Sequence, residues 1–281
     1  MIDKQQSRNP YHAVSQPPQF LRSVCLYMDM LGYKEMWFRA EQESSQDSFL
    51  QKLYEALDEG QQWLSPHDSD LWPTDKDRYA IKAFTDNIVI GWPVRGDGES
   101  ELGSIFSNIA YFQLRMATQG FFVRGAISVG DVYVDDVVVL GSAFLEAYQG
   151  EAQAANPRII LTDTASNAVK RHLTYYSQVD HAPQYSDLYQ DSDGKWFVNY
   201  LETILAAGED CPFSEELEKH RDNIIQRLEK FRSDSRIQAK YIWAANYHNF
   251  FCDQRPHYFS EYKVDSSAYQ TSFRRIARAN P

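Results

Sequence analysis

The pattern of hydrophobic and polar positions divides the first part of the chain into alternating strands and helices. A short apolar run, 23–29, has the length and flanks of a buried strand, since it ends in a carboxylate and a glycine follows. From residue 33 to residue 64 the apolar side chains recur every three or four positions, which predicts a helix with a polar interruption at 42–47. Two strand-like runs, 78–85 and 87–92, then meet at a residue pair suited to a tight hairpin.

The same alternation continues to about residue 205. An amphipathic helix is predicted over 102–118, and Gly120 is placed to end it. Two strands, 121–129 and 132–140, are expected to pair around a Gly-Asp turn at 130–131. The next predicted elements are a helix, a strand and a helix, at 141–155, 157–161 and 162–172. The order β-α-β-β-α-β-β-α-β-α is typical of an α+β fold.

The two ends of the chain differ from this core. Residues 1–21 are polar and proline-containing, which predicts an N-terminal arm. The α+β domain is expected over 22–205. Beyond it, 206–281 is expected to be a helical C-terminal appendage, whose second helical segment, 237–251, is rich in aromatic residues. Such an appendage would cover a sheet or a partner subunit.

Composition limits the class of protein. The 281 residues are 43% hydrophobic, which supports a sizeable core and excludes a wholly disordered chain. The formal net charge of -11 would repel a phosphate backbone, so no nucleic-acid partner is expected. Three distant cysteines without CxxC spacing suit a reducing cytosol. With a polar start and no apolar run of roughly 18–20 residues, we expect a cytoplasmic protein that does not enter a membrane.

Two acidic residues stand out because each lies where a predicted strand ends. Asp29 ends the first strand, in YMDMLGY, and Asp86 lies at the tip of the predicted hairpin, in KAFTDNIVI. An antiparallel sheet can place a strand end beside a hairpin tip, so the two carboxylates could face one point. Two hard oxygen ligands with an open coordination sphere suit Mg²⁺ or Mn²⁺ shared with substrate phosphates. Taken singly, each Asp is more often a helix cap or a turn residue.

The segment that follows Asp29 adds a second requirement of phosphate chemistry. Residues 30–33 lead into a helix, whose free backbone N–H groups would hold phosphate oxygens. A metal beside a phosphate cradle indicates phosphoryl or nucleotidyl transfer. Esterase, P-loop, Rossmann and zinc-hydrolase motifs are absent from the sequence. His220 and His248 are expected to be ordinary helix residues.

Several segments together resemble a known family. DMLGY and KAFTDNIV resemble the two metal-binding segments of class III nucleotidyl cyclases, whose βαββαβ palm is shared with GGDEF proteins and many polymerases. VRGAISVGDVYV (123–134) and GSAFLEAYQGEAQAANPRIIL (141–161) resemble the next strand pair, helix and strand of that family. With the late KYIWAANYHN (240–249), the chain looks most like the Pycsar cyclases, bacterial antiphage enzymes that make cyclic pyrimidine mononucleotides. The resemblance covers roughly residues 22–205 and the helical tail.

The resemblance implies roles for individual residues. Asp29 and Asp86 match the two metal-binding aspartates, and Met30 matches the position whose backbone carbonyl contacts the second metal. Gly32 and Tyr33 match the turn that contacts the substrate phosphates. The implied cofactors are two Mg²⁺ or Mn²⁺ ions per site.

The departures from the family pattern concern the base and the transition state. In purine cyclases an Asn and an Arg follow the glycine at Gly141 by four and eight residues, where this chain has Leu145 and Gln149. The Asp that reads adenine is replaced by Val138, whereas Lys82 keeps the position of the base-contacting lysine. The metal-binding part therefore matches while the purine-reading part does not, which fits a pyrimidine cyclase or a catalytically weakened relative.

Five further residues have both a functional and a structural interpretation. Arg124 lies between apolar neighbours and needs a carboxylate or phosphate partner, so it is a catalytic candidate with an ordinary salt bridge as the alternative. Arg158 is expected to be structural. Tyr148 and Glu151 could face the cleft, although helix packing is the more frequent role for such a tyrosine. Tyr54 could stack on a base, although burial in the core is more frequent.

We therefore expect a pyrimidine nucleotide cyclase that converts UTP to 3′,5′-cyclic UMP and pyrophosphate as a second messenger in antiphage defence. UTP is favoured because Lys82 could donate to uracil O4 but would repel the amino group of cytosine. The alternatives are a cytidylate cyclase and a palm domain that binds a nucleotide without catalysis; a diguanylate cyclase is disfavoured because GG[DE]EF is absent. The resemblance implies a homodimer with sites at the interface, and an effector that responds to the cyclic product.

Overall fold

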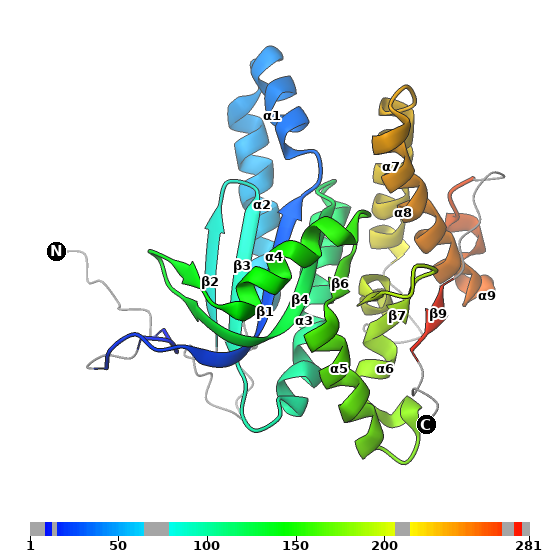
Figure 1. The fold of residues 1–281 in the computed structure, drawn as a ribbon. Helices are drawn as coiled ribbons and strands as arrows, with labels where there is room; N and C mark the ends of the chain where they lie inside the picture. Colours follow the sequence, from blue (N-terminus) through cyan, green and yellow to red (C-terminus); the bar gives the residue numbers. More distant parts are fainter. Residues whose placement is uncertain (1–8, 13–15, 65–78, 206–213, 266–272, 277–281) are drawn as a thin grey trace.

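The central feature of the fold is a β-sheet whose first four strands have the order of a split βαβ unit. The computed structural model of the chain describes residues 9–12, 16–64, 79–205, 214–265 and 273–276 (Figure 1). Within this part of the chain the strands lie in the order β2-β3-β1-β4-β6-β8-β7-β9, and β5 pairs with β4. Strands β2, β3, β1 and β4 are antiparallel neighbours, whereas β6 runs parallel to β4. The strands are β1 (Leu21–Met30), β2 (Ala80–Phe84), β3 (Asn87–Pro93), β4 (Val123–Val134), β5 (Val139–Leu140), β6 (Ile159–Leu161), β7 (Leu188–Gln190), β8 (Trp196–Val198) and β9 (Arg274–Arg275).

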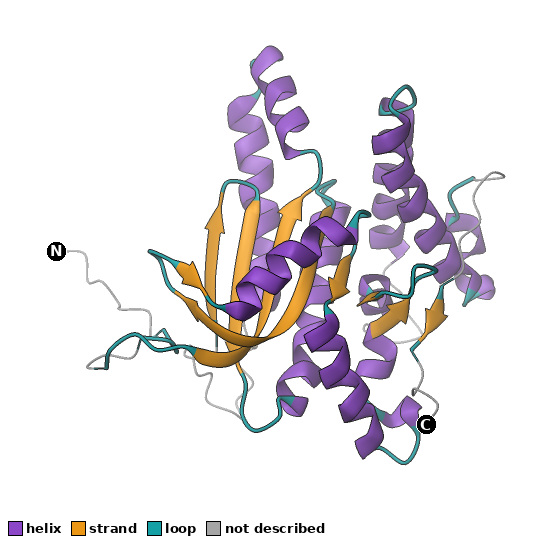
Figure 2. Ribbon diagram, in the orientation of Figure 1, coloured by secondary structure: helices purple, strands orange, loops and turns teal. Residues whose placement is uncertain are grey.

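Helices cover both faces of this sheet (Figure 2). The α-helices are α1 (Tyr33–Gln42), α2 (Gln46–Leu64), α3 (Glu99–Thr118), α4 (Ser142–Ala154), α5 (Asp163–His172), α6 (Gln184–Asp187), α7 (Ser214–Lys230), α8 (Ser235–Asp253) and α9 (Pro256–Phe259). Short 3₁₀ segments are Leu173–Tyr175, Val179–His181, Tyr200–Leu205 and Ser260–Tyr262. Because α1 and α2 join β1 to β2, and α3 joins β3 to β4, the chain has the βαββαβ order of a palm. The predicted α+β class with a mainly antiparallel sheet is confirmed.

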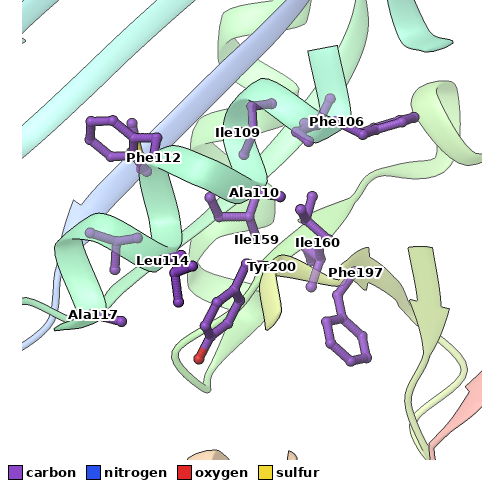
Figure 3. Close-up of a cluster of buried hydrophobic side chains, with 14 of the residues drawn as sticks. Phe106, Ile109, Ala110, Phe112, Leu114, Ala117, Ile159, Ile160, Phe197 and Tyr200 are labelled. Carbon is purple, nitrogen blue, oxygen red and sulfur yellow. The ribbon is translucent and has the colours of Figure 1, made fainter. Parts of the chain in front are cut away.

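Strand β1 is buried on both faces because alternate side chains enter two different cores. Leu26 and Met28 belong to the larger core under α2 and α3, whereas Cys25 and Tyr27 belong to a smaller core under α4. Figure 3 shows part of the larger core, where side chains of α3 lie near those of β6 and β8. Burying a large apolar side chain contributes roughly 1.5–3 kcal/mol, so this central strand fixes the position of its last residues, which carry the site.

The predicted turn at 130–131 is wrong. Strand β4 continues through it, because Gly130 and Asp131 pair with Ser23 and Arg22 of β1 and their backbone groups are satisfied in the ladder. The chain turns later, where the carboxylate of Asp135 accepts hydrogen bonds from the next backbone N–H groups at 2.7 Å, and β5 follows. A Gly-Asp pair favours a turn locally, but a long partner strand outweighs that preference.

The C-terminal helices pack against the domain rather than extending from it. Helix α7 lies on α3 and on α8, and the predicted segment 237–251 falls inside α8. The side chain of Asp234 caps α8 by accepting from two backbone N–H groups at 3.1 Å. In the N-terminal arm, Tyr11 is fully buried and donates to the hydroxyl of Ser23 at 2.9 Å. No helix in the described ranges combines the length and the apolar character needed to cross a membrane.

Candidate active site

The two candidate carboxylates lie next to each other at one end of the sheet. Asp29 is the penultimate residue of β1, and Asp86 lies in the two-residue turn between β2 and β3. The N–H of Met30 donates to the carbonyl oxygen of Asp86 at 3.1 Å, so the hairpin tip is tied to the strand end. The side chain of Asn87 donates to the Asp86 carboxylate at 3.1 Å. Two residues that are far apart along the chain thus come together in the fold.

The closeness of the two carboxyl groups affects the pKa of Asp29. Burial and a hydrogen bond with Asp86 raise the pKa of Asp29 to about 6, although Arg124 opposes the shift. A second negative charge in a partly buried position is unfavourable unless a cation compensates it. Arg124 supplies one such cation to Asp29, and a bound metal ion would supply another to the pair.

Arg124 connects Asp29 to α4. It lies opposite Asp29 in the β1–β4 ladder, and its Nη2 is 3.1 Å from the Asp29 Oδ2. Its Nε is 2.5 Å from the Oε1 of Glu151, which projects from α4 and is largely buried. Burial raises the pKa of Glu151, and the guanidinium opposes that shift. The salt-bridge alternative for Arg124 is thus present in the structure, and its catalytic role stays a prediction.

The predicted phosphate turn precedes α1. Gly32 has φ 76°, a left-handed conformation that favours glycine, and it occupies the N-cap of α1 without a side-chain cap. Tyr33 is the first helical residue, and its ring packs on Phe49 with the centroids 6.0 Å apart. The N–H groups of the first helical turn have no partners within the helix, so they can bind an anion beside Asp29.

The candidate base-contacting residue lies on the same face of the sheet as Asp29. Lys82 pairs with Val89, which belongs to the smaller core under α4, as does Tyr27 two residues before Asp29. Burial opposes the shift, but hydrogen bonds and the charge of Lys82 lower the pKa of Asp135, which lies between β4 and β5. Lys82 therefore interacts with the acid Asp135 and also lies on the sheet face that leads to Asp29.

Two of the residues that depart from the purine-cyclase pattern, Leu145 and Gln149, lie on α4, whereas Val138 precedes β5. Leu145 is 57% exposed and Tyr148 is 53% exposed, although the Tyr148 ring also packs on Tyr27 at 5.3 Å. Gln149 lines a cavity of about 770 Å³ between α4, α5 and the β7–β8 hairpin. Neither this cavity nor one of about 690 Å³ beside α7 is lined by Asp29 or Asp86.

Two of the structural interpretations can be settled. Arg158 is 2% exposed and forms ion pairs with Asp191 and Asp193, so its structural role is confirmed. Tyr54 is 68% exposed, so the expectation of burial is wrong. It lies away from the buried side of α2, which is formed by residues such as Leu53.

Sequence patterns missed a buried polar chain that crosses the C-terminal helices. The Tyr200 hydroxyl lies 2.8 Å from Nε2 of His220, whose Nδ1 lies 2.9 Å from Nδ1 of His248. Nε2 of His248 lies 2.9 Å from the carbonyl oxygen of Tyr262. Both histidines lie on helices, as expected, His220 on α7 and His248 on α8, but the sequence did not indicate that their rings are buried and bonded to each other. No local pattern marks them, because the two rings meet across different helices.

The donor set at the sheet end fits a hard divalent cation. Among the described residues, no group of three or more His, Cys, Asp or Glu side chains is arranged as a metal cluster. Two adjacent carboxylates would leave most coordination positions to water and substrate, as is usual for Mg²⁺, and the role of the Met30 carbonyl stays a prediction. The closeness of the Asp29 and Asp86 carboxyl groups at the tied strand end and hairpin tip favours this fit, because a bound cation would stabilise the ionised form of both.

Comparisons with known proteins give similarity at the level of solved structures. No family model and no curated protein matches the chain. A bacterial light-regulated adenylyl cyclase is similar over 75% of this chain and 59% of its own, with 10% identity and a TM-score of 0.44. The catalytic core of a rhodopsin-guanylyl cyclase with converted specificity, in complex with ATPαS, is similar over 64% of this chain and 97% of its own, with 13% identity and a TM-score of 0.41. The chain thus spans 59% of the adenylyl cyclase, and at these TM-scores the likeness assigns neither family nor activity.

Proposed function

We propose that this protein is a metal-dependent nucleotidyl cyclase that converts UTP to 3′,5′-cyclic UMP and pyrophosphate. The observation that carries the proposal is the pair Asp29 and Asp86, held together at the end of a βαββαβ sheet beside a phosphate-binding turn. Two Mg²⁺ or Mn²⁺ ions held by this pair and by the Met30 carbonyl would lower the pKa of the ribose 3′-hydroxyl and neutralise the triphosphate.

The chain's own groups orient the substrate for the reaction. The backbone N–H groups at Gly32 and Tyr33 bind phosphate oxygens, and Arg124 supplies a positive charge at the strand opposite Asp29. The ribose 3′ oxygen attacks the α-phosphorus in line, the bond from that phosphorus to the β-phosphate oxygen breaks, and pyrophosphate leaves. The hydroxyl proton passes to solvent.

The preference for a pyrimidine is supported by what α4 and β2 present. Leu145 and Gln149 cannot supply the Asn and Arg functions of purine cyclases, and Val138 cannot accept a hydrogen bond from adenine through its side chain. Lys82, on the same sheet face as Asp29, can donate to the O4 of uracil. CTP is the alternative substrate if Lys82 instead contacts O2, which both pyrimidines share.

A homodimer with sites at the interface is part of the proposal. Exposed apolar side chains gather on the β4–β5 hairpin and on α4, where Leu140 is 51% exposed and Leu145 is 57% exposed. A second copy that covers this face would remove apolar surface from water. The cytoplasmic role in antiphage defence follows from the sequence resemblance, with a separate effector that binds the cyclic product.

The second candidate function is nucleotide binding without catalysis, which Leu145 and Gln149 favour because they leave the transition state without the usual Asn and Arg. Measuring cyclic UMP from UTP and Mn²⁺ with Asp29→Asn and Asp86→Asn separates the two functions. Asp187→Asn is the matched control, because burial also raises the pKa of Asp187 to about 6 while it lies outside the site. A cyclase loses its product in the first two variants only. A binding module makes no product in any variant, and undiminished product in either site variant contradicts the assigned roles.

A further inference from the structure

The C-terminal helices are attached to the segment that leads into β4. The side-chain amide of Asn223 on α7 donates to the carbonyl oxygens of Ala117 and Thr118 at 3.0 and 2.9 Å. Arg227, also on α7, donates to the carbonyl oxygen of Gly120 at 2.9 Å. The Ala117 carbonyl oxygen also accepts from the N–H of Gly120 at 3.0 Å, so α7 adds side-chain bonds to the backbone at the end of α3. The appendage therefore fixes the backbone a few residues before Arg124.

Helix α8 is held against the same segment by a buried aromatic contact. Tyr241 is 1% exposed and packs edge-to-face on Phe122, with ring centroids 5.4 Å apart. Its other side stacks on Phe231 at 5.8 Å. The carbonyl oxygen of Phe122 accepts from the N–H of Leu31 at 2.8 Å, two residues after Asp29. The packing thus places the α8 residue next to Tyr241 beside the strand ends that carry the candidate site.

That neighbouring residue is Lys240, a half-buried cation. Its ammonium group interacts with Asp29 and Glu151, which raise its pKa, and with Arg124 and Arg236, which lower it, while burial has the largest effect and lowers the pKa. Among the described residues it forms neither an ion pair nor a hydrogen bond. Partly buried lysines without a counterion are uncommon, because desolvation of the charge is unfavourable.

The neighbouring carboxylates are already engaged, which leaves Lys240 available for a ligand. Arg124 pairs with both Asp29 and Glu151, at 3.1 and 2.5 Å, and Asp29 is also assigned to the metal. A second cation beside this cluster raises the local positive potential. An oxyanion with several charges is the ligand that such a position stabilises best.

We infer that Lys240 binds a phosphate group of the substrate and of the leaving pyrophosphate, so that the C-terminal helix α8 completes the active site of its own chain. The inference rests on the proposed function for the identity of the ligand. It extends the site beyond the α+β domain, because the residue comes from the appendage and not from the palm. It also explains why α7 and α8 are fixed to the residues that precede β4: a shift of these helices would move a phosphate-binding charge.

The test measures binding of inorganic pyrophosphate with excess Mg²⁺ by titration calorimetry, which does not depend on turnover. Lys240→Gln and Lys240→Met should each weaken binding about ten-fold, the usual effect of losing a hydrogen bond to a charged group. Lys240→Arg should bind within about three-fold of the unaltered protein, since it keeps the charge. The control is Lys219→Gln on α7, where Lys219 is exposed and pairs with Glu215 at 2.7 Å. It should leave binding unchanged.

The outcomes separate this inference from the proposed function. If the unaltered protein does not bind pyrophosphate, or if both neutral variants bind it as tightly as the unaltered protein, the inference is wrong. If cyclic UMP is formed and neither neutral variant changes pyrophosphate affinity or the KM for UTP, the cyclase assignment survives and the role of Lys240 does not. If no nucleotide is cyclised but the neutral variants still bind pyrophosphate more weakly than the unaltered protein, the phosphate site is supported and the cyclase assignment is wrong. Circular dichroism of each variant checks that the fold is retained.

Discussion

Acid should destabilise the protein through two buried histidines whose protonation the fold opposes. The carbonyl oxygen of Tyr262 can only accept, so Nε2 of His248 carries a proton and its Nδ1 accepts from His220. Nε2 of His220 then accepts from the Tyr200 hydroxyl. Every ring nitrogen is thus satisfied in the neutral form, and an added proton would break the chain. Burial lowers the pKa of His248 to about 4 and that of His220 well below its usual value.

The size of the effect follows from the shift of His248. Its unfolded pKa of 6.5 exceeds the folded value of about 4, so the unfolded state binds the proton first. Stability is therefore lost as the pH falls from about 6.5 toward about 4. At pH 5 this single residue should cost about 2 kcal/mol relative to neutral pH. Asp29 and Asp187 act in the opposite direction, because their pKa values are raised to about 6 and they gain protons on folding.

The pH dependence of the free energy of unfolding must therefore be compared between the unaltered chain and a His248 variant. His248→Gln keeps a donor for the Tyr262 carbonyl but cannot be charged. The free energy of unfolding is measured by urea titration with tryptophan fluorescence, at about pH 7.5 and about pH 5, for this variant and the unaltered chain. Between the two pH values the variant should lose about 2 kcal/mol less than the unaltered chain. An equal loss in both proteins would refute the buried, neutral state of His248.

Two further predictions concern buried charges elsewhere. Asp187→Asn should stabilise the protein by about 1–3 kcal/mol near pH 7, since burial raises the pKa of Asp187 to about 6 and its charged form is disfavoured; the gain should vanish below about pH 4, and thermal unfolding at both pH values checks it. Arg158→Met should destabilise by about 3–5 kcal/mol, because it leaves the buried carboxylate of Asp191 without its cation; an effect below about 1 kcal/mol in a urea titration would show that the ion pair is unimportant.

Local sequence signals predicted the parts of the fold that depend on local contacts. The hydrophobic patterns of three elements are each typical of one type of secondary structure. These elements are the apolar strand β1, the hairpin of β2 and β3, and the amphipathic helix α3. The hairpin prediction also placed Asp86 at a turn, which is why the carboxylate pair could be proposed before its geometry was known.

The errors have a common cause in long-range pairing. The turn expected at Gly130 is absent because β1 extends far enough to pair with it. Strands β7, β8 and β9 contain two or three residues each, too few to show an alternating pattern. The histidine chain and the approach of Lys240 to the candidate site depend on how α8 packs, and no spacing within the sequence reports that packing.

The central claim is tested most directly by offering the purified protein equal concentrations of ATP, GTP, CTP and UTP with Mn²⁺ and identifying the products by mass spectrometry. The account predicts 3′,5′-cyclic UMP as the main product, with one pyrophosphate released for each cyclic nucleotide formed, and no product from the Asp29→Asn protein. The absence of any cyclic nucleotide, or a cyclic purine as the main product, would contradict it.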